Sequence, residues 1–295
     1  MDEGDWGVLV AGLTGITVVT VTRRRAEMLR RAMASVDRQD YSGVIEHLIV
    51  VDDDRQTINS LAGWESRMQR PVTIEAQGPV VSRQEGSRAF VYPHLARLLN
   101  VGISLARFPW IAFLDDDNEF EADHVSSLVA LAQETGARAV HSGRAFVWPD
   151  GTPYLERHLP SAATLEEGQR LYELLCRRGV WVRDTNIVLD RVDSGVGSDA
   201  LNSTVMDDGD PVFLVDQNLW LVQRDLLLDV PVPDDFTSAE IDQNTCPDDK
   251  MLAALTAAGV EIYSTGRPTV RYTVGGNGIS NGGHVQRTGS ASRDC

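Results

Sequence analysis

The sequence predicts an α/β fold with a mostly parallel central sheet flanked by helices. Two apolar segments, 48–51 and 110–114, each end in three consecutive aspartates. Uninterrupted apolar runs of this length are typical of strands that are buried on both faces of a sheet. Such segments alternate with helical patterns along the first half of the chain, and this order favours parallel strands joined by right-handed crossovers.

The first half of the chain divides into strand patterns separated by helical patterns. β-Branched or apolar runs predict strands at 16–21, 46–54, 72–76, 110–114 and 138–142. Apolar residues at helical spacing predict helices at 26–36, 56–70, 95–106 and 121–134. Residues 77–93 are rich in Gly, Pro and Ser, which predicts a loop.

The second half is less regular, and we expect a smaller mixed part of the structure there. Residues 146–154 predict a strand that runs into a Pro-Asp-Gly turn. Further patterns predict a helix at 249–258 and short strands at 212–215, 219–222, 260–263 and 269–273. From Gly275 onward the chain is glycine-rich without apolar periodicity, which predicts a mobile tail.

The composition argues against several classes of partner. A net charge of −16 disfavours a nucleic acid or an anionic membrane surface, because both require a basic face. Cys176, Cys246 and Cys295 lack C-x-x-C spacing, so we expect neither a disulfide framework nor a zinc site. The acidic N-terminus does not resemble a signal peptide, and the apolar stretch 7–21 is too short to span a membrane. We therefore expect a soluble, cytoplasmic protein.

The two acidic clusters at strand ends carry the functional prediction. Asp115–Asp117 follow one apolar strand, and Asp52–Asp54 follow another. The carboxyl ends of parallel strands share one edge of a sheet, which is where such sheets bind ligands. Because carboxylate oxygens are the ligands that Mg²⁺ and Mn²⁺ prefer, the two clusters predict a divalent metal and a polar ligand. A solvated acidic turn is the alternative for either cluster alone.

Four ordered blocks of the sequence resemble a known family. Residues 18–36 and then 48–54 resemble the opening of the family-two glycosyltransferases with the GT-A fold. Residues 97–106 and then 110–117 resemble that family's next block, a helix leading into the strand that carries the metal-binding DxD motif. The resemblance implies a GT-A, Rossmann-like fold: a mostly parallel central sheet flanked by helices, with a smaller mixed C-terminal part.

The resemblance also assigns roles to parts of the chain. It implies one GT-A domain in which residues 1–143 bind the nucleotide-sugar donor and residues 144–274 bind the acceptor and supply the catalytic base. Residues 275–295 are expected to be a flexible tail or lid. The implied activity is transfer of a sugar, with inversion, from a nucleoside-diphosphate sugar to a hydroxyl or amine of a small-molecule or glycoside acceptor. A UDP-sugar is the expected donor, and Mn²⁺ or Mg²⁺ the expected cofactor.

The resemblance carries over to particular residues of the donor site. The loop after the first strand, here Thr22 and Arg23, lines the nucleotide pocket in such enzymes. The acid after the second strand, here Asp52 or Asp54, holds the base or the ribose.

The central motif is expected to contact the ribose and to bind the metal that bridges the diphosphate. We expect Asp117 to be the direct metal ligand, and Asp115 and Asp116 to contact the donor, with Asp115 reaching the ribose or the metal through water. A C-terminal histidine completes the metal site in some GT-A enzymes, and His284 is the candidate here. A solvated histidine is the alternative.

Arg88 and Arg97 are further candidates for the donor site. Either guanidinium would supply positive charge near the diphosphate or the base. A surface salt bridge is the alternative for each of them.

An inverting enzyme of this family also needs a carboxylate that accepts the acceptor's proton. Asp248 and Asp249 stand directly before a helical pattern, where the family carries a Glu-Asp pair. We favour Asp249 as the base and keep Asp248 as the alternative, because the first residue departs from the usual glutamate. Both are also favourable helix-start residues on structural grounds alone.

Other functions remain as alternatives at this point. A sugar-phosphate nucleotidyltransferase shares this kind of sheet, but the loop from Thr22 to Arg25 has no glycine for the phosphate loop of such enzymes. A non-catalytic sugar- or nucleotide-binding protein with the same fold is the other alternative, although both acidic clusters and a candidate base are present.

Overall fold

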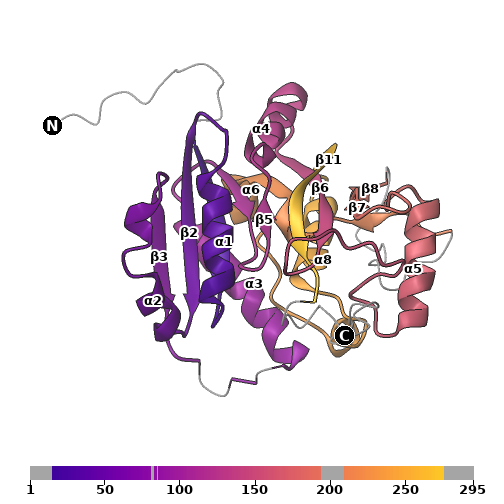
Figure 1. The fold of residues 1–295 in the computed structure, drawn as a ribbon, viewed down its shortest axis with the longest axis horizontal. Helices are drawn as coiled ribbons and strands as arrows, with labels where there is room; N and C mark the ends of the chain where they lie inside the picture. The colour runs from indigo at the N-terminus through magenta and orange to yellow at the C-terminus, as the bar shows by residue number, and fades with distance from the viewer. Residues whose placement is uncertain (1–14, 81–82, 85, 194–208, 276–295) are drawn as a thin grey trace, which may run out of the picture.

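The computed structural model describes residues 15–80, 83–84, 86–193 and 209–275. These residues form an α/β fold around a nine-stranded mixed sheet with the order β3-β2-β1-β4-β10-β6-β11-β5, in which β7 also pairs with β6 (Figure 1). Its strands are β1 (Gly15–Thr22), β2 (Val44–Asp52), β3 (Val72–Gln77), β4 (Trp110–Phe113), β5 (Glu119–Phe120), β6 (Ala139–Val147), β7 (Ile187–Val188), β10 (Trp220–Gln223) and β11 (Ile262–Thr273). A separate antiparallel pair consists of β8 (Arg191–Val192) and β9 (Phe213–Leu214).

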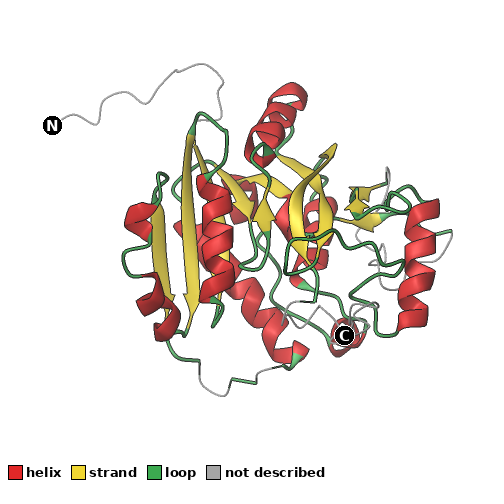
Figure 2. Cartoon of the chain, in the orientation of Figure 1, coloured by secondary structure: helices red, strands yellow, loops and turns green. Residues whose placement is uncertain are grey.

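The helices lie around this sheet (Figure 2). They are α1 (Ala26–Asp37), α2 (Arg55–Leu61), α3 (Arg88–Leu105), α4 (His124–Thr135), α5 (Leu165–Arg177), α6 (Arg224–Asp229), α7 (Ser238–Asp242) and α8 (Pro247–Ala257). Two short 3₁₀ helices are η1 (Glu65–Arg67) and η2 (Gln217–Leu219).

The first part of the sheet is parallel, as the sequence predicts. Strand β1 pairs in parallel with β2 and β4, and β2 pairs in parallel with β3. The second part is mixed, because β10 runs antiparallel to β4 and β6 while β11 runs parallel to β6 and antiparallel to β5. The predicted fold class, a mostly parallel sheet with a smaller mixed C-terminal part, is confirmed.

Helices cover both faces of the parallel strands, which explains their uninterrupted apolar sequences. On one face, Leu29 and Met33 of α1 cluster with Ile49 of β2. On the other face, α3 crosses β1 so closely that Gly102 lies against Val19. A methyl group at Gly102 would come within 2.4 Å of Val19 Cγ1, so this crossing requires a residue without a side chain.

A second apolar cluster lies between β6 and α5. Its aromatic rings pack edge to face: the ring centroids of Phe146 and Trp181 are 5.1 Å apart, as are those of Tyr172 and Trp181. Helix α5 was not predicted from the sequence. Thr164 caps it by accepting a hydrogen bond from the Glu167 backbone N–H at 3.1 Å, and one side of the helix is buried in this cluster.

The predicted helix 56–70 is instead α2 followed by the short 3₁₀ helix η1, and two more elements, α3 and β11, differ from the sequence prediction for identifiable reasons. Helix α3 begins at Arg88, inside the predicted loop 77–93, and it includes Pro93, a residue that normally indicates a helix boundary. Strand β11 replaces two predicted strands. Gly266, with φ of 63°, and Pro268 interrupt its register against β6, and this interruption produced the break in the sequence pattern.

Some predictions fall on parts of the chain that are not described. Residues 276–295, which include most of the predicted tail and Cys295, lie outside the described residues. Among the helices of the described ranges, none combines the length and the apolar character that crossing a membrane would require.

Candidate active site

Polar groups from three parallel strands meet at one edge of the sheet. The Thr22 hydroxyl, at the end of β1, donates a hydrogen bond to Asp116 Oδ2 just after β4, at 2.7 Å. Asp52 ends the neighbouring strand β2, whose Val51 pairs with Thr22. The two acidic clusters identified in the sequence therefore lie at the same sheet edge.

Arg25, at the start of α1, links two aspartates of the central motif. Its Nη1 atom donates to Asp116 Oδ1 at 3.0 Å and to Asp117 Oδ2 at 3.1 Å. Burial raises the pKa of both carboxyls, and the charge of Asp116 helps to raise that of Asp117 to about 6 against the opposing effect of Arg25. The sequence indicated Thr22 and Arg23 for this loop and did not single out Arg25.

Asp115 is held by two amide side chains of η2. Asn218 Nδ2 donates to Asp115 Oδ2 at 2.8 Å, and Gln217 Nε2 donates to Asp115 Oδ1 at 3.1 Å. The Asp115 backbone N–H in turn donates to Asn218 Oδ1 at 2.5 Å. Burial, followed by the charges of Asp117 and Asp216, raises the pKa of Asp115 well above its ordinary value. Neither amide residue was identified from the sequence, because they are about a hundred positions away in the chain.

The second acidic cluster contains two aspartates with different partners. Asp52 accepts two hydrogen bonds from Arg83, at 2.8 and 2.7 Å, and contacts His94 Nε2 at 2.9 Å. Burial acts to raise the pKa of Asp52, but the hydrogen bonds from Arg83 and His94 lower it below its usual value. Asp54 caps α2 by accepting from Thr57 N at 3.1 Å, and it also accepts from Arg24 N at 2.7 Å.

The other basic candidates and His284 lie in different surroundings. Arg23 is partly buried in the loop after β1. Arg88 is exposed at the first position of α3. Arg97 forms an ion pair with Asp234 at 2.6 Å in which the two side chains are 61% and 47% exposed, so it matches the surface alternative. His284 lies outside the described residues.

The two candidate catalytic bases, Asp248 and Asp249, lie in the first turn of helix α8. Cys246 is the N-cap residue, and Asp249 accepts hydrogen bonds from its backbone N–H at 2.9 Å and its thiol at 3.0 Å. The same thiol donates to Asp248 Oδ1 at 2.6 Å. Burial, then the charges of Asp249 and Asp216, raises the pKa of Asp248 to about 7, and burial also raises that of Asp249. After burial and the charges of Asp117 and Asp216, the charge of Asp248 makes a further contribution to the raised pKa of Asp115.

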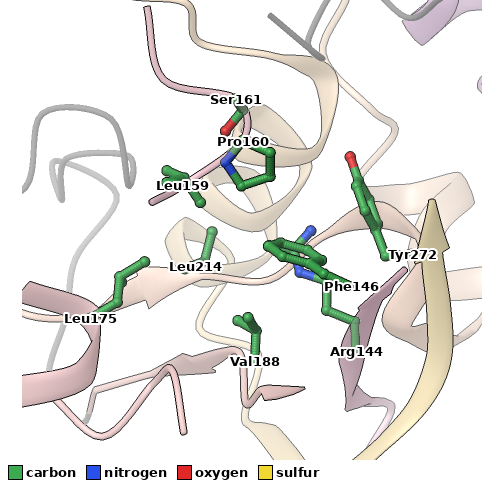
Figure 3. A pocket seen from close by; sticks show the side chains of 9 residues that line it. All are labelled: Arg144, Phe146, Leu159, Pro160, Ser161, Leu175, Val188, Leu214 and Tyr272. Carbon is green, nitrogen blue, oxygen red and sulfur yellow. The ribbon is translucent and has the colours of Figure 1, made fainter. Parts of the chain in front are cut away.

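A second buried charged cluster lies beside the site. Arg144 on β6 is 7% exposed and pairs with Asp190 at 3.1 Å and with Asp216. Its guanidinium lies 5.2 Å from the ring centroid of Phe146 and 4.9 Å from that of Tyr272, and Figure 3 shows it beside these rings. These side chains border a cavity of about 40 Å³. Its remaining walls are Leu159, Pro160, Ser161, Leu175, Val188 and Leu214. The volume suits ordered water rather than a sugar ring.

The carboxylate oxygens of the central motif, Asp115–Asp117, are of the kind that binds a divalent cation. Asp115 and Asp117, just after β4, could supply hard oxygen ligands. The charge of Asp117 raises the pKa of Asp115, and the charge of Asp116 raises that of Asp117, so added positive charge would relieve this repulsion. Within the described ranges, no group of three or more His, Cys, Asp and Glu side chains is arranged to hold a metal ion. A cation at Asp115 and Asp117 would therefore take further ligands from the donor and from water.

Solved structures with similar folds are glycosyltransferases. S. aureus TarS residues 1–349, in complex with UDP-GlcNAc, is 14% identical with a TM-score of 0.54, and the match covers 92% of this chain and 62% of that one. A mannosyltransferase from Pyrobaculum calidifontis, in complex with GDP-Man and Mn²⁺, is 14% identical with a TM-score of 0.50, covering 94% of this chain and 62% of that one. The match to another structure of TarS residues 1–349 spans 60% of the length of that chain.

These structural likenesses, at such low identity, show the fold, which is GT-A. No similar protein was found among the curated proteins. The model of the family "Glycosyl transferase family 2" matches residues 17–181, which is more than half of the chain. The match includes both acidic clusters at the sheet edge and the loop that carries Arg25. The chain therefore belongs to glycosyltransferase family 2.

Proposed function

We propose that this glycosyltransferase transfers a sugar, with inversion and with a divalent metal, from a nucleoside-diphosphate sugar to a hydroxyl or amine of a small-molecule acceptor. A UDP-sugar is the proposed donor. The proposal rests on two carboxylate groups linked electrostatically, since the charge of Asp248 contributes to the raised pKa of Asp115, and on the contacts of Thr22 and Arg25 with Asp116 and Asp117. One group, Asp115–Asp117, ends a parallel strand, and the other, Asp248 and Asp249, begins a helix from the second half of the chain.

The donor side of the proposal rests on the sheet edge. Thr22 and Arg25 hold the central aspartates in place, and Asp52 lies on the adjacent strand. The similar TarS structure is complexed with UDP-GlcNAc and the similar mannosyltransferase with GDP-Man, and these complexes support a nucleotide-sugar donor. We propose that Asp115 contacts the ribose, directly or through water.

The proposed metal ligands are Asp117 and Asp115. A divalent cation bound there would supply the positive charge that stabilises the diphosphate as it leaves. Asp117 contributes a carboxylate whose pKa is raised first by burial and then by the charge of Asp116. The Mn²⁺ in the similar mannosyltransferase structure supports this assignment.

We propose Asp248 as the base that accepts the proton of the acceptor. The Asp249 carboxylate accepts the backbone N–H of Cys246 and thereby caps α8, whereas Asp248 makes no such backbone contact to the cap residue. Its pKa of about 7 suits proton transfer near neutral pH, because a base works best when its pKa is close to the working pH. This assignment reverses the preference for Asp249 that the sequence alone supported.

Calorimetric titration with UDP, GDP and dTDP, each with and without Mn²⁺, tests the donor site. We expect one nucleotide to bind the wild-type protein in a Mn²⁺-dependent manner and to lose that dependence, with most of its affinity, in Asp117→Ala. Asp234→Ala is the matched control, since it removes an exposed aspartate that pairs with Arg97. Metal-dependent binding of none of the three nucleotides, or unchanged binding in Asp117→Ala, would contradict the proposal.

A further inference from the structure

A continuous series of hydrogen bonds and ion pairs joins the buried cluster around Arg144 to Asp115. Arg144 pairs with one oxygen of Asp216, and the other oxygen, Oδ1, accepts from Asn218 Nδ2 at 2.7 Å. The Asn218 backbone N–H donates to the same oxygen at 3.0 Å. Asn218 Nδ2 then donates to Asp115 at 2.8 Å. One amide side chain therefore lies between two carboxylates.

Asn218 uses both ends of its amide on Asp115. Its Nδ2 atom bonds the carboxylate and its Oδ1 atom accepts the Asp115 backbone N–H, so both the side chain and the main chain of Asp115 are fixed. Asn218 is completely buried, and it has no alternative partner in water. Neighbouring Gln217 bonds the other oxygen of Asp115, which leaves this carboxylate little freedom to rotate.

The support for Asn218 is itself buried and charged. Asp216 is 8% exposed, Asp190 is 1% exposed, and Asp190 also accepts from the Asp216 backbone N–H at 3.1 Å. Arg144 pairs with both carboxylates, and burial raises the pKa of Asp190 to about 7. Apolar residues of similar size often stabilise a core as well as such a buried cluster does, so stability alone does not account for it.

We propose that Asn218 is a positioning residue that orients Asp115 toward the donor nucleotide, and that the Arg144–Asp216 ion pair holds Asn218 in place. This inference rests on the proposed function, because Asp115 is a donor contact only there. Without the amide, Asp115 would lose its orientation next to two further carboxylates, Asp116 and Asp117. Pre-organisation of this kind lowers the cost of ordering the site when the donor binds.

The test measures nucleotide affinity in Asn218→Ala. We expect the Mn²⁺-dependent affinity for UDP, GDP or dTDP, whichever binds the wild-type protein, to fall at least about tenfold, as for lost hydrogen bonds to a charged group. The KM for the donor should rise while the KM for the acceptor is unchanged. A purely structural asparagine would not produce this split.

Asn100→Ala is a closely matched control. Asn100 makes the same reciprocal amide contacts, donating to Val232 O at 2.8 Å and accepting from Val232 N at 3.0 Å, but it lies within α3 and has no contact with the central motif. Its loss should lower the melting temperature and leave nucleotide affinity unchanged. If Asn218→Ala does not fold, Asn218→Ser, which keeps one donor, gives the result, with an expected loss of affinity that is smaller but still measurable.

Two further variants separate the inference from the proposed function. Asp115→Ala should lose nucleotide affinity, and Arg144→Lys, which keeps the charge but not the forked geometry, should lose less than Asn218→Ala. Loss in Asp115→Ala together with wild-type affinity in a folded Asn218 variant would overturn the positioning role alone. Absence of nucleotide binding by the wild-type protein would overturn the donor site and this inference together.

Discussion

The carboxylates at the sheet edge and those at the start of α8 differ in their partners. At the edge, arginines oppose the aspartates: Arg83 pairs with Asp52, and Arg25 contacts the central motif. At α8, no ion pair to Asp248 or Asp249 occurs within the described part of the chain. There the contact shared by the two carboxylates is the thiol of Cys246.

This difference corresponds to two kinds of chemistry. Hydrogen bonds from Arg83 and His94 lower the pKa of Asp52, so this carboxylate stays ionised, and Arg25 opposes the rise in the pKa of Asp117. A buried carboxylate without a cation retains its proton up to higher pH, and it then exchanges that proton near neutrality, as a general base must. In the proposed function the fold thus separates a binding edge, Asp52 and Asp115–Asp117, from a proton-accepting helix end, Asp248 and Asp249, which the second half of the chain supplies.

The largest effect that this comparison predicts is at Asp248. In Asp248→Asn the proposed base is lost, so we expect kcat to fall by about 10²–10⁴-fold, the usual contribution of general base catalysis. In Asp249→Asn the amide oxygen can still accept the Cys246 backbone N–H, so the helix cap is kept and most activity should remain. Initial rates at saturating donor decide between them, and the opposite ranking would identify Asp249 as the base.

The pH profile of kcat adds a second readout to this pair of variants. A base must be deprotonated to work, and the pKa of Asp248 is about 7, so the rate should decline about tenfold per pH unit below that value. The charge of Asp249 contributes to the raised pKa of Asp248. The midpoint should therefore move to lower pH in Asp249→Asn, and a midpoint that does not move would contradict the coupling.

A smaller effect is expected when the binding edge loses its arginine. Arg25→Gln leaves Asp116 and Asp117 without their shared counter-charge, and we expect the free energy of unfolding to fall by about 3 kcal/mol. Mn²⁺ should restore part of this loss, because a cation that binds only the folded state stabilises it. Urea denaturation with and without Mn²⁺ measures both effects.

Arg97→Gln is the control for this substitution. Its ion pair with Asp234 is largely exposed and should contribute little, with or without the metal. If Arg25→Gln and Arg97→Gln gave equal stability in metal-free buffer, the contrast between the binding edge and the surface would fail.

The smallest effect is expected at Asp54. Its carboxylate caps α2, and loss of an N-cap costs about 1 kcal/mol, so Asp54→Ala should lower the melting temperature modestly. Nucleotide affinity should stay unchanged if Asp52, and not Asp54, faces the donor. Thermal melting and the calorimetric titration together test this, and a large loss of affinity in Asp54→Ala would make Asp54 a donor contact.

The parallel half of the fold was predictable because each of its strands carries a local signal. Continuous apolar residues marked β2 and β4, and the aspartates after them marked the sheet edge. The contacts of Arg25 with the aspartates were not predictable from the sequence, and neither was the left-handed φ of 57° at the preceding residue, Arg24. Any of Arg23, Arg24 and Arg25 could have contacted the aspartates, and the sequence pattern does not specify the backbone conformation of this loop.

The residues that hold Asp115 were not predictable for another reason. Asn218 follows an apolar strand pattern in the second half and carries no motif of its own, and its contact joins positions that are 103 apart in sequence. Helix α5 was missed although Thr164 and Glu167 form a readable start signal, so that miss was avoidable. The sequence therefore predicted local helices and strands better than it predicted contacts between distant segments.

The thiol of Cys246 makes the first turn of α8 chemically observable. Burial and the charges of Asp248 and Asp249 raise its pKa well above the usual value, so it stays protonated and reacts poorly with alkylating reagents while the turn is closed. Opening of the turn would remove both carboxylates and expose the sulfur to solvent. The rate at which Cys246 is alkylated therefore reports how often this helix end opens, in an otherwise unmodified chain.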